Sequence, residues 1–277
     1  MTNTTPSQSE KADRFRALHA NSDSFIIANA FDAGTARILT GMGFEALATS
    51  SGGFAGTLGR RDGGVTREEA LTHARAVVEA TDLPVSADLE NGFGHEPSAA
   101  AKTVQLAAEA GLVGCSIEDF SGDPDLGFYD LDSAVARIAA SADAARAVGF
   151  AFTLTGRSEN FIRGNPDLDD TIARLKAYEA AGADVLMAPG LPDVAAVKTV
   201  CDALSKPFNF MVGIPGKSFT VAELAGAGVK RISLATSLYR AAMSGVVAAA
   251  TEAKENGTFS FVDTSMPTPE LAGYMRG

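Results

Sequence analysis

Cysteine and long apolar stretches are scarce in this sequence, and each shortage excludes a class of protein. Two cysteines, Cys115 and Cys201, lie far apart in apolar surroundings. They form neither a disulfide framework nor a metal-spaced pair, so we expect two buried, reduced thiols in a cytoplasmic protein. No apolar run approaches the length of a membrane span, and the polar N-terminus lacks the apolar core of a secretory signal.

Positive charge is also in short supply. The chain carries 23 Lys and Arg against 34 Asp and Glu, a formal net charge of −11. This balance argues against nucleic acid or an acidic membrane as a partner, but it leaves room for a local cationic pocket that binds a small acid. Hydrophobic residues make up 46% and charged residues 21%, which favours a folded globule with a sizeable core.

Two glycine motifs for phosphate binding are missing. The turn after the first apolar run reads ANAFDAG, which lacks the glycine fingerprint of a dinucleotide-binding sheet. GIPGKS (213–218) contains Gly-Lys-Ser, but a P-loop needs a glycine at position 211, where the chain has Met. We therefore expect no P-loop.

Short β-rich runs alternate with Ala-rich helical patterns along nearly the whole chain. The pattern has no linker, so it predicts one (β/α)₈ barrel domain over 1–277, with a short N-terminal helix and a C-terminal tail from about 256. A doubly wound open sheet is the alternative. The predicted strands are 25–30, 45–50, 83–88, 112–118, 150–156, 183–189, 207–213 and 229–235.

Acidic residues gather where these strands end. Asp88 ends the third run with Glu90 two residues on, Glu118 ends the fourth, and Asp62 lies in the glycine-rich segment after the second. Active sites of such barrels lie at the carboxyl ends of the strands, and converging carboxylates are ligands for a hard divalent cation. The pattern predicts a Mg²⁺ site, with Mn²⁺ as the alternative metal. Since Asn91-Gly92 is a strong turn signal, the first pair alone is equally compatible with a surface turn.

Two further features predict substrate binding at the same rim. Arg157, after the fifth run, suits a two-pronged contact with a carboxylate, although it is also a natural ion-pair partner for the acids. The glycine-rich turn after Ser51 is expected to aim backbone N–H groups at an oxygen that becomes anionic.

The order of these motifs resembles the isocitrate lyase / phosphoenolpyruvate mutase superfamily over about residues 24–250. The motifs are ANAFDAGTARI, TSSGG, RRDGG, ADLENGFG, SIED, GRSENF and VKRISLATSLYRAA. The resemblance implies a barrel whose last helix is exchanged between subunits of a homodimer or homotetramer, a Mg²⁺ ion and a small 2-oxo or 2-hydroxy acid substrate. It implies Asp88 as the direct metal ligand, with Asp62, Glu90 and Glu118 holding metal waters. Ser51 and Gly52 match the oxyanion amides, and Ser50, Ser51, Gly52 and Arg157 the substrate-binding residues.

The chain departs from the superfamily in two places. The second acid after strand three is usually Asp, and here it is Glu90. The lid EDFSGDPDLGFYDLD (118–132) contains none of the Cys, Lys, Asn or His residues that distinguish the lyase and mutase branches. Tyr129 is the candidate proton donor in this lid, and bulk water is the alternative.

The leading hypothesis is therefore a Mg²⁺-dependent lyase that cleaves a C–C bond through a pyruvate-like enolate, as a decarboxylase or a retro-aldol enzyme. One alternative is P–C bond chemistry on a phosphonate such as phosphonopyruvate, which the acidic lid disfavours. The other is a non-catalytic barrel that keeps the metal site for ligand binding.

Overall fold

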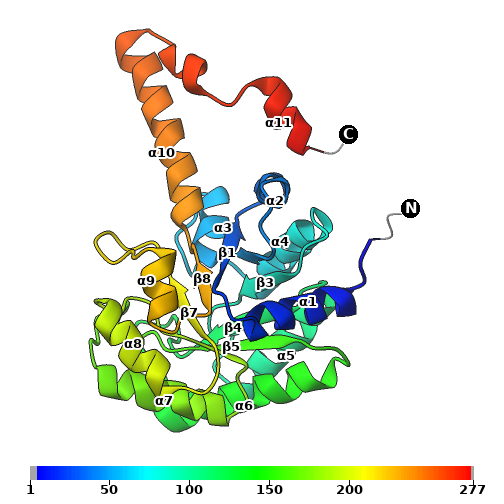
Figure 1. Ribbon diagram of the computed structural model, residues 1–277, viewed down its shortest axis with the longest axis vertical. Helices are drawn as coiled ribbons and strands as arrows, with labels where there is room; N and C mark the ends of the chain where they lie inside the picture. Colours follow the sequence, from blue (N-terminus) through cyan, green and yellow to red (C-terminus); the bar gives the residue numbers. More distant parts are fainter. Residues whose placement is uncertain (1–4, 276–277) are drawn as a thin grey trace.

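The computed structural model describes residues 5–275, in which eight parallel strands close into a barrel (Figure 1). The strands follow in chain order, and the last pairs with the first. The predicted (β/α)₈ barrel is confirmed, and the open-sheet alternative is wrong. Residues 1–4 and 276–277, the ends of the expected single domain, lie outside the described residues. The strands are β1 (Phe25–Ala30), β2 (Leu47–Thr49), β3 (Val85–Asp88), β4 (Gly114–Glu118), β5 (Thr153–Arg157), β6 (Val185–Met187), β7 (Phe208–Met211) and β8 (Arg231–Ser233).

Helices connect the strands and surround the barrel. Several begin at a Ser, Thr or Asp whose side chain accepts a hydrogen bond from the first turn, as Thr66 does from the Glu69 N–H. The glycine-rich segment predicted as a turn after Ser51 instead begins a short helix, α3. The helices up to β8 are α1 (Gln8–Ala20), α2 (Ala33–Gly41), α3 (Ser51–Thr57), α4 (Arg67–Glu79), α5 (Pro97–Glu109), α6 (Leu131–Ala147), α7 (Leu168–Ala180), α8 (Val194–Ala203) and α9 (Val221–Gly226).

The main core lies between the strands and their helices and consists largely of Ala, Val and Leu. A second cluster closes the barrel at the amino ends of the strands, which we call the floor. There α1 packs Phe15 edge-on against Phe25 at the start of β1. Both cysteines are free, but only Cys115 is buried and Cys201 is half-buried, so the expectation of two buried thiols is wrong for Cys201.

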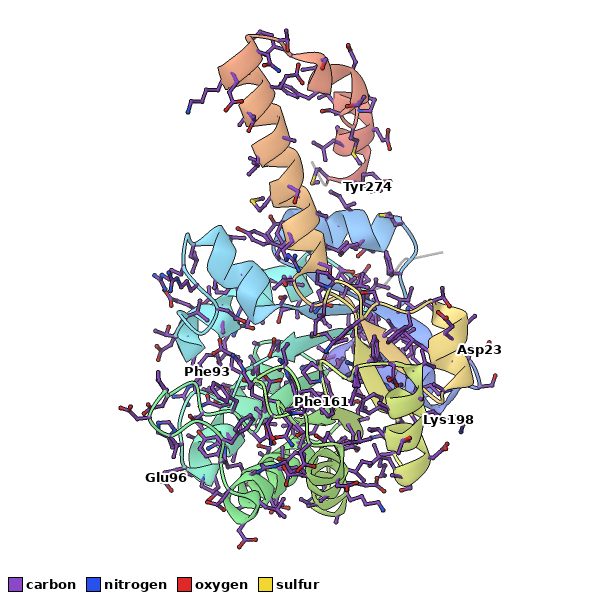
Figure 2. All side chains as sticks on the ribbon, turned by 90° about the vertical axis from the view of Figure 1, so that its left-hand side faces the viewer. Asp23, Phe93, Glu96, Phe161, Lys198 and Tyr274 are labelled. Atoms are coloured by element: carbon purple, nitrogen blue, oxygen red, sulfur yellow. The ribbon has the colours of Figure 1, made fainter. Side chains whose placement is uncertain are left out.

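Residues 237–275 form an extension that we call the C-terminal arm. It consists of α10 (Ser237–Thr251), a π-helical turn (Glu252–Asn256), a 3₁₀ turn (Ser260–Thr264) and α11 (Thr268–Tyr274). α10 rises away from the barrel, and the chain then turns back towards α2 (Figures 1 and 2). There Tyr274 packs on Gly41 of α2. No residue of these four elements is buried. Among the described residues, no helix has the length and apolar character needed to cross a membrane.

Candidate active site

The predicted acids meet at the carboxyl end of the barrel, around two adjoining cavities. The first, the barrel cavity, has a volume of about 150 Å³ and is lined by Asp62, Asp88 and Arg157 among others. The second, the lid cavity, has a volume of about 190 Å³, and its lining includes Asp62, Glu90, Glu118 and Arg157. The structure therefore brings together the four predicted metal acids and the predicted substrate arginine, which come from four different loops and strand ends.

The segment after β3 is both a tight turn and part of the site. Glu90 has a φ of 50°, in the left-handed region that side chains other than glycine rarely adopt, and Gly92 follows with a φ of 83°. The Gly92 N–H donates to the Leu89 carbonyl at 2.8 Å, and the Glu118 N–H donates to the Glu90 carbonyl at 3.0 Å. These bonds hold the strained backbone in place and direct the Glu90 side chain to the lid cavity.

Burial and mutual repulsion favour protonation of two of these acids. Burial, followed by the charges of Asp88 and Asp62, raises the pKa of Glu90 to about 7. Burial, followed by the charge of Glu159, raises the pKa of Glu118 well above its usual range. Glu90 Oε1 is buried and has no hydrogen-bond partner. The rim thus carries more negative charge than its own cations offset.

This donor set fits a Mg²⁺ ion held largely through water. Among residues 5–275, no three His, Cys, Asp or Glu side chains are drawn close enough together to ligate a metal directly. Mg²⁺ keeps several waters and often takes one or two carboxylates, so this spacing suits it better than a metal enclosed by protein ligands. The unpartnered Glu90 oxygen and the excess of carboxylates are what a hydrated cation would satisfy.

Arg157 lies between the acids. Its Nε donates to Glu159 Oε1 at 2.5 Å, and its Nη1 lies 3.5 Å from both Asp88 Oδ2 and Glu118 Oε2. Burial lowers its pKa, but the charges of Glu159, Glu118 and Asp88 outweigh burial and raise the pKa well above its usual value. The ion-pairing alternative is therefore observed, and binding of a substrate carboxylate by Arg157 stays a prediction.

The serines after β2 lie at the start of α3. Ser50 Oγ accepts a hydrogen bond from the Gly53 N–H, and Ser51 Oγ donates to Asp88 Oδ2 at 2.9 Å. Gly52 has no room for a side chain, because a Cβ would lie 2.9 Å from Thr236 Cγ2 and 3.2 Å from the Asp62 carboxylate. Ser50, Ser51 and Gly52, three of the four predicted substrate residues, line the barrel cavity together with the fourth, Arg157.

Tyr129 is not among the residues that line these two cavities. It is only 5% exposed, and its hydroxyl lies 2.9 Å from His95 Nδ1 and 3.2 Å from Asn91 Nδ2. The Arg137 guanidinium lies over its ring, 4.3 Å from the centroid. In this lid conformation the Tyr129 side chain is buried outside both cavities, and its role as proton donor stays a prediction.

Sequence reasoning missed several site residues. Glu159 is fully buried and also accepts a hydrogen bond from Arg163 Nε at 3.0 Å. Asn209 and Arg231 line the lower part of the barrel cavity. Glu159 stands two residues after Arg157, the same spacing as Asp88 and Glu90, which was an available signal. No local pattern marks Asn209 or Arg231.

Together, the fold and the site define a (β/α)₈ barrel protein with a cluster of carboxylates at the carboxyl ends of its strands, which is where active sites of such barrels lie. The family model of phosphoenolpyruvate phosphomutase matches residues 15–254, so the chain belongs to that family. The superfamily assignment from the motifs is confirmed. The prediction of an enzyme of the isocitrate lyase / phosphoenolpyruvate mutase type is also confirmed.

Three of the similar proteins match more than nine tenths of the chain. A Burkholderia cenocepacia protein described as a lyase/mutase is 50% identical, with a TM-score of 0.94 and 96% of each chain covered. The 2-methylisocitrate lyase of Escherichia coli is 29% identical over 93% of this chain and 89% of its own. A 2,3-dimethylmalate lyase structure is 25% identical, with a TM-score of 0.86 and coverages of 95% and 94%. Two relatives from Corynebacterium glutamicum are matched over only 60% and 59% of their length.

Proposed function

We propose that the protein is a Mg²⁺-dependent lyase that cleaves a C–C bond of a small 2-oxo or 2-hydroxy di- or tricarboxylic acid through a pyruvate-like enolate. The observation that carries this proposal is the excess of carboxylates around Arg157 at the strand ends, with one buried Glu90 oxygen unpartnered. Two relatives, 2-methylisocitrate lyase and 2,3-dimethylmalate lyase, bear the names of lyases and support the reaction class. Either a decarboxylase or a retro-aldol reaction fits these requirements.

The residues at the rim of the barrel each have a defined role in this proposal. Asp88 would hold Mg²⁺ directly, and Asp62, Glu90 and Glu118 would hold its waters, with Mn²⁺ as a substitute metal. When bound, the ion supplies positive charge that stabilises the developing enolate oxygen. The backbone N–H groups of Ser51 and Gly52 would donate to the same oxygen, and Arg157 would orient the substrate carboxylate. Gly52 is needed there because any Cβ would push Asp62 or Thr236 away.

The test is turnover of purified protein on a panel of 2-oxo and 2-hydroxy diacids, with release of pyruvate or glyoxylate as the readout. We expect turnover with Mg²⁺ and none after chelation. Phosphonopyruvate belongs in the same panel, because its turnover in preference to the carboxylic acids would favour the P–C alternative. If no member of the panel yields pyruvate or glyoxylate, the lyase proposal is contradicted. Equal oxalate binding by wild type and Asp88→Ala, with no turnover in either protein, would favour a non-catalytic barrel.

We also propose that the C-terminal arm packs on a second copy of the chain, giving a homodimer or homotetramer. The arm leaves large apolar side chains exposed that a neighbouring barrel would cover: Val246, Val247, Phe259, Val262, Met266 and Leu271. We expect the double variant Val247→Asp/Phe259→Asp to lower the molecular mass measured by light scattering, and Val221→Asp on α9 to leave it unchanged. An unchanged mass in the arm variant, or a monomeric wild type, would rule the arm out as the interface.

A further inference from the structure

Arg231 lies at the base of the barrel cavity and is only 5% exposed. Its Nε donates to Asn209 Oδ1 at 2.7 Å, and its Nη2 donates to Thr155 Oγ1 at 2.9 Å. Its Nη1 lies 3.4 Å from His19 Nε2 on α1. These contacts use three of the five N–H groups of the guanidinium, and every partner is a neutral side chain.

Within the part of the chain that the structure describes, no carboxylate forms an ion pair with Arg231. Among residues 5–275, no carboxylate oxygen lies within 4.0 Å of its guanidinium, whereas Arg157 has three such partners. Burial lowers the pKa of Arg231 to about 9. His19 adds no negative charge, because its Nδ1–H donates to the Phe15 carbonyl and its neutral Nε2 faces the arginine. A buried cation in this state is costly unless an anion completes the site.

The barrel cavity connects this cation to the acidic rim. Its lining runs from Asp88 and Arg157 down to Arg231, and the wall between them contains the small polar side chains of Ser86, Ser116 and Ser233. Barrels of this class usually fill their interior with bulky branched residues. Here the interior instead leaves a cavity between the rim and the buried guanidinium, in which these serines stand beside apolar side chains such as Ile27 and Met187.

Side-chain contacts, and not strand register, place the two arginine head groups at different depths of this passage. Arg157, Met187, Asn209 and Arg231 occupy one row of paired residues across β5 to β8. The Arg157 side chain extends to the rim acids, whereas Arg231 extends to Thr155, two residues earlier on β5. Two residues of a strand span about 7 Å, which a short carbon chain with an acid group at each end can bridge.

We propose that Arg231 binds the distal carboxylate of a dicarboxylic substrate whose 2-oxo or 2-hydroxy acid end lies at the Asp88 rim. This inference rests on the proposed function and names its substrate class. One carboxylate supplies the single negative charge that the base of the cavity lacks. It would also accept hydrogen bonds from the Arg231 N–H groups that Asn209, Thr155 and His19 do not use.

Arg137 shows what a purely structural buried arginine looks like in the same chain. It is 1% exposed and likewise has no carboxylate within 4.0 Å among the described residues, but it donates to the carbonyls of Asn91 and His95 and lies over the Tyr129 ring. It is not among the residues lining the two site cavities. Arg231 differs because it faces a cavity large enough for a ligand.

The test compares binding of malate, lactate and oxalate by calorimetry in the presence of Mg²⁺. Lactate is malate with a hydrogen in place of the distal carboxylate, and oxalate tests the metal end alone. We expect wild-type protein to bind malate about tenfold to a hundredfold more tightly than lactate. Arg231→Gln should reduce this preference below about threefold while oxalate affinity stays within about twofold.

Two control variants separate charge from packing. Arg231→Lys keeps the charge and should retain a preference for malate above about threefold, and His19→Gln changes the floor but keeps Arg231 and should retain the full preference. A crystal of the wild type soaked with Mg²⁺ and malate should place one carboxylate within hydrogen-bond distance of Arg231, which tests the site even if Arg231→Gln does not fold.

The outcomes distinguish this inference from the proposed function. If the wild type binds oxalate but does not prefer malate to lactate, the Arg231 subsite is overturned and the metal site stands. If Arg231→Gln keeps the full malate preference, or if malate in the crystal lies away from Arg231, the subsite is likewise overturned. If neither oxalate nor malate binds with Mg²⁺, both proposals fail.

Discussion

The two ends of the barrel cavity have opposite electrostatic character. At the rim, Asp62, Asp88, Glu90 and Glu118 surround Arg157, and burial together with mutual repulsion raises the pKa of Glu90 and Glu118. At the base, Arg231 is bonded only to neutral groups, and burial lowers its pKa. The rim is short of positive charge and the base is short of negative charge. This difference indicates a ligand that brings a cation to one end and a carboxylate to the other.

Replacing Asp88 should have the largest effect on the rim. Asp88→Asn removes the charge of the proposed direct metal ligand, so we expect kcat/KM with Mg²⁺ to fall by about a thousandfold or more. Steady-state turnover of the best diacid substrate is the measurement. Asp125→Asn, an exposed acid in the lid, is the matched control and should change turnover by less than about twofold. Comparable turnover in Asp88→Asn and wild type would place the metal elsewhere.

Arg157 tests whether the rim arginine binds substrate or only offsets the acids. Arg157→Lys keeps the charge but loses the two-pronged geometry, so we expect kcat/KM to fall by about tenfold to a hundredfold while the fold is retained. Arg163→Lys is the control, since Arg163 contacts the same Glu159 carboxylate. We expect a loss of less than about threefold there. Equal losses of kcat/KM in the two variants would show that Arg157 acts only as an ion-pair partner of the acids.

At the floor, His19 should make stability depend on pH. Burial, followed by the charge of Arg231, lowers its pKa to about 3 in the folded protein, against about 6.5 when unfolded. The unfolded chain therefore binds a proton that the folded chain does not. The resulting stability is fully present above about pH 6.5 and is lost as the pH falls towards 3, by up to about 1.4 kcal/mol per pH unit.

The measurement is the free energy of unfolding by urea between pH 6 and pH 4.5. The His19→Gln variant cannot take up this proton, so its free energy of unfolding should fall less steeply as the pH is lowered. The difference between the two slopes should correspond to close to one bound proton per molecule. Parallel curves for the two proteins would show that the buried histidine is not neutral at the floor.

The smallest expected effect is at Tyr129, a buried residue of the lid. Its hydroxyl lies between His95 and Asn91 and outside both cavities, so we expect Tyr129→Phe to lower kcat by less than about threefold. Turnover and its solvent isotope effect are the measurements. A loss of a hundredfold with a changed isotope effect would instead support the tyrosine as the proton donor and imply that the lid moves during the reaction.

The rim was predictable because its residues stand at positions that the chain order defines. Asp88 and Glu118 end two apolar runs, and parallel strands bring their carboxyl ends to one edge, so their meeting needs no knowledge of distances. Residues within the barrel were not predictable in this way. Asn209 and Arg231 face the cavity from within β7 and β8, where no strand end marks them.

The sequence by itself therefore determined the barrel, the acidic rim and the family, since all three depend on local patterns and their order along the chain. The tertiary structure alone decided that Arg231 meets Asn209, Thr155 and His19 but, among residues 5–275, no acid. The physical reason is that these contacts join residues up to 212 positions apart. Their pairing depends on how the strands are staggered as the barrel closes, which no local pattern records.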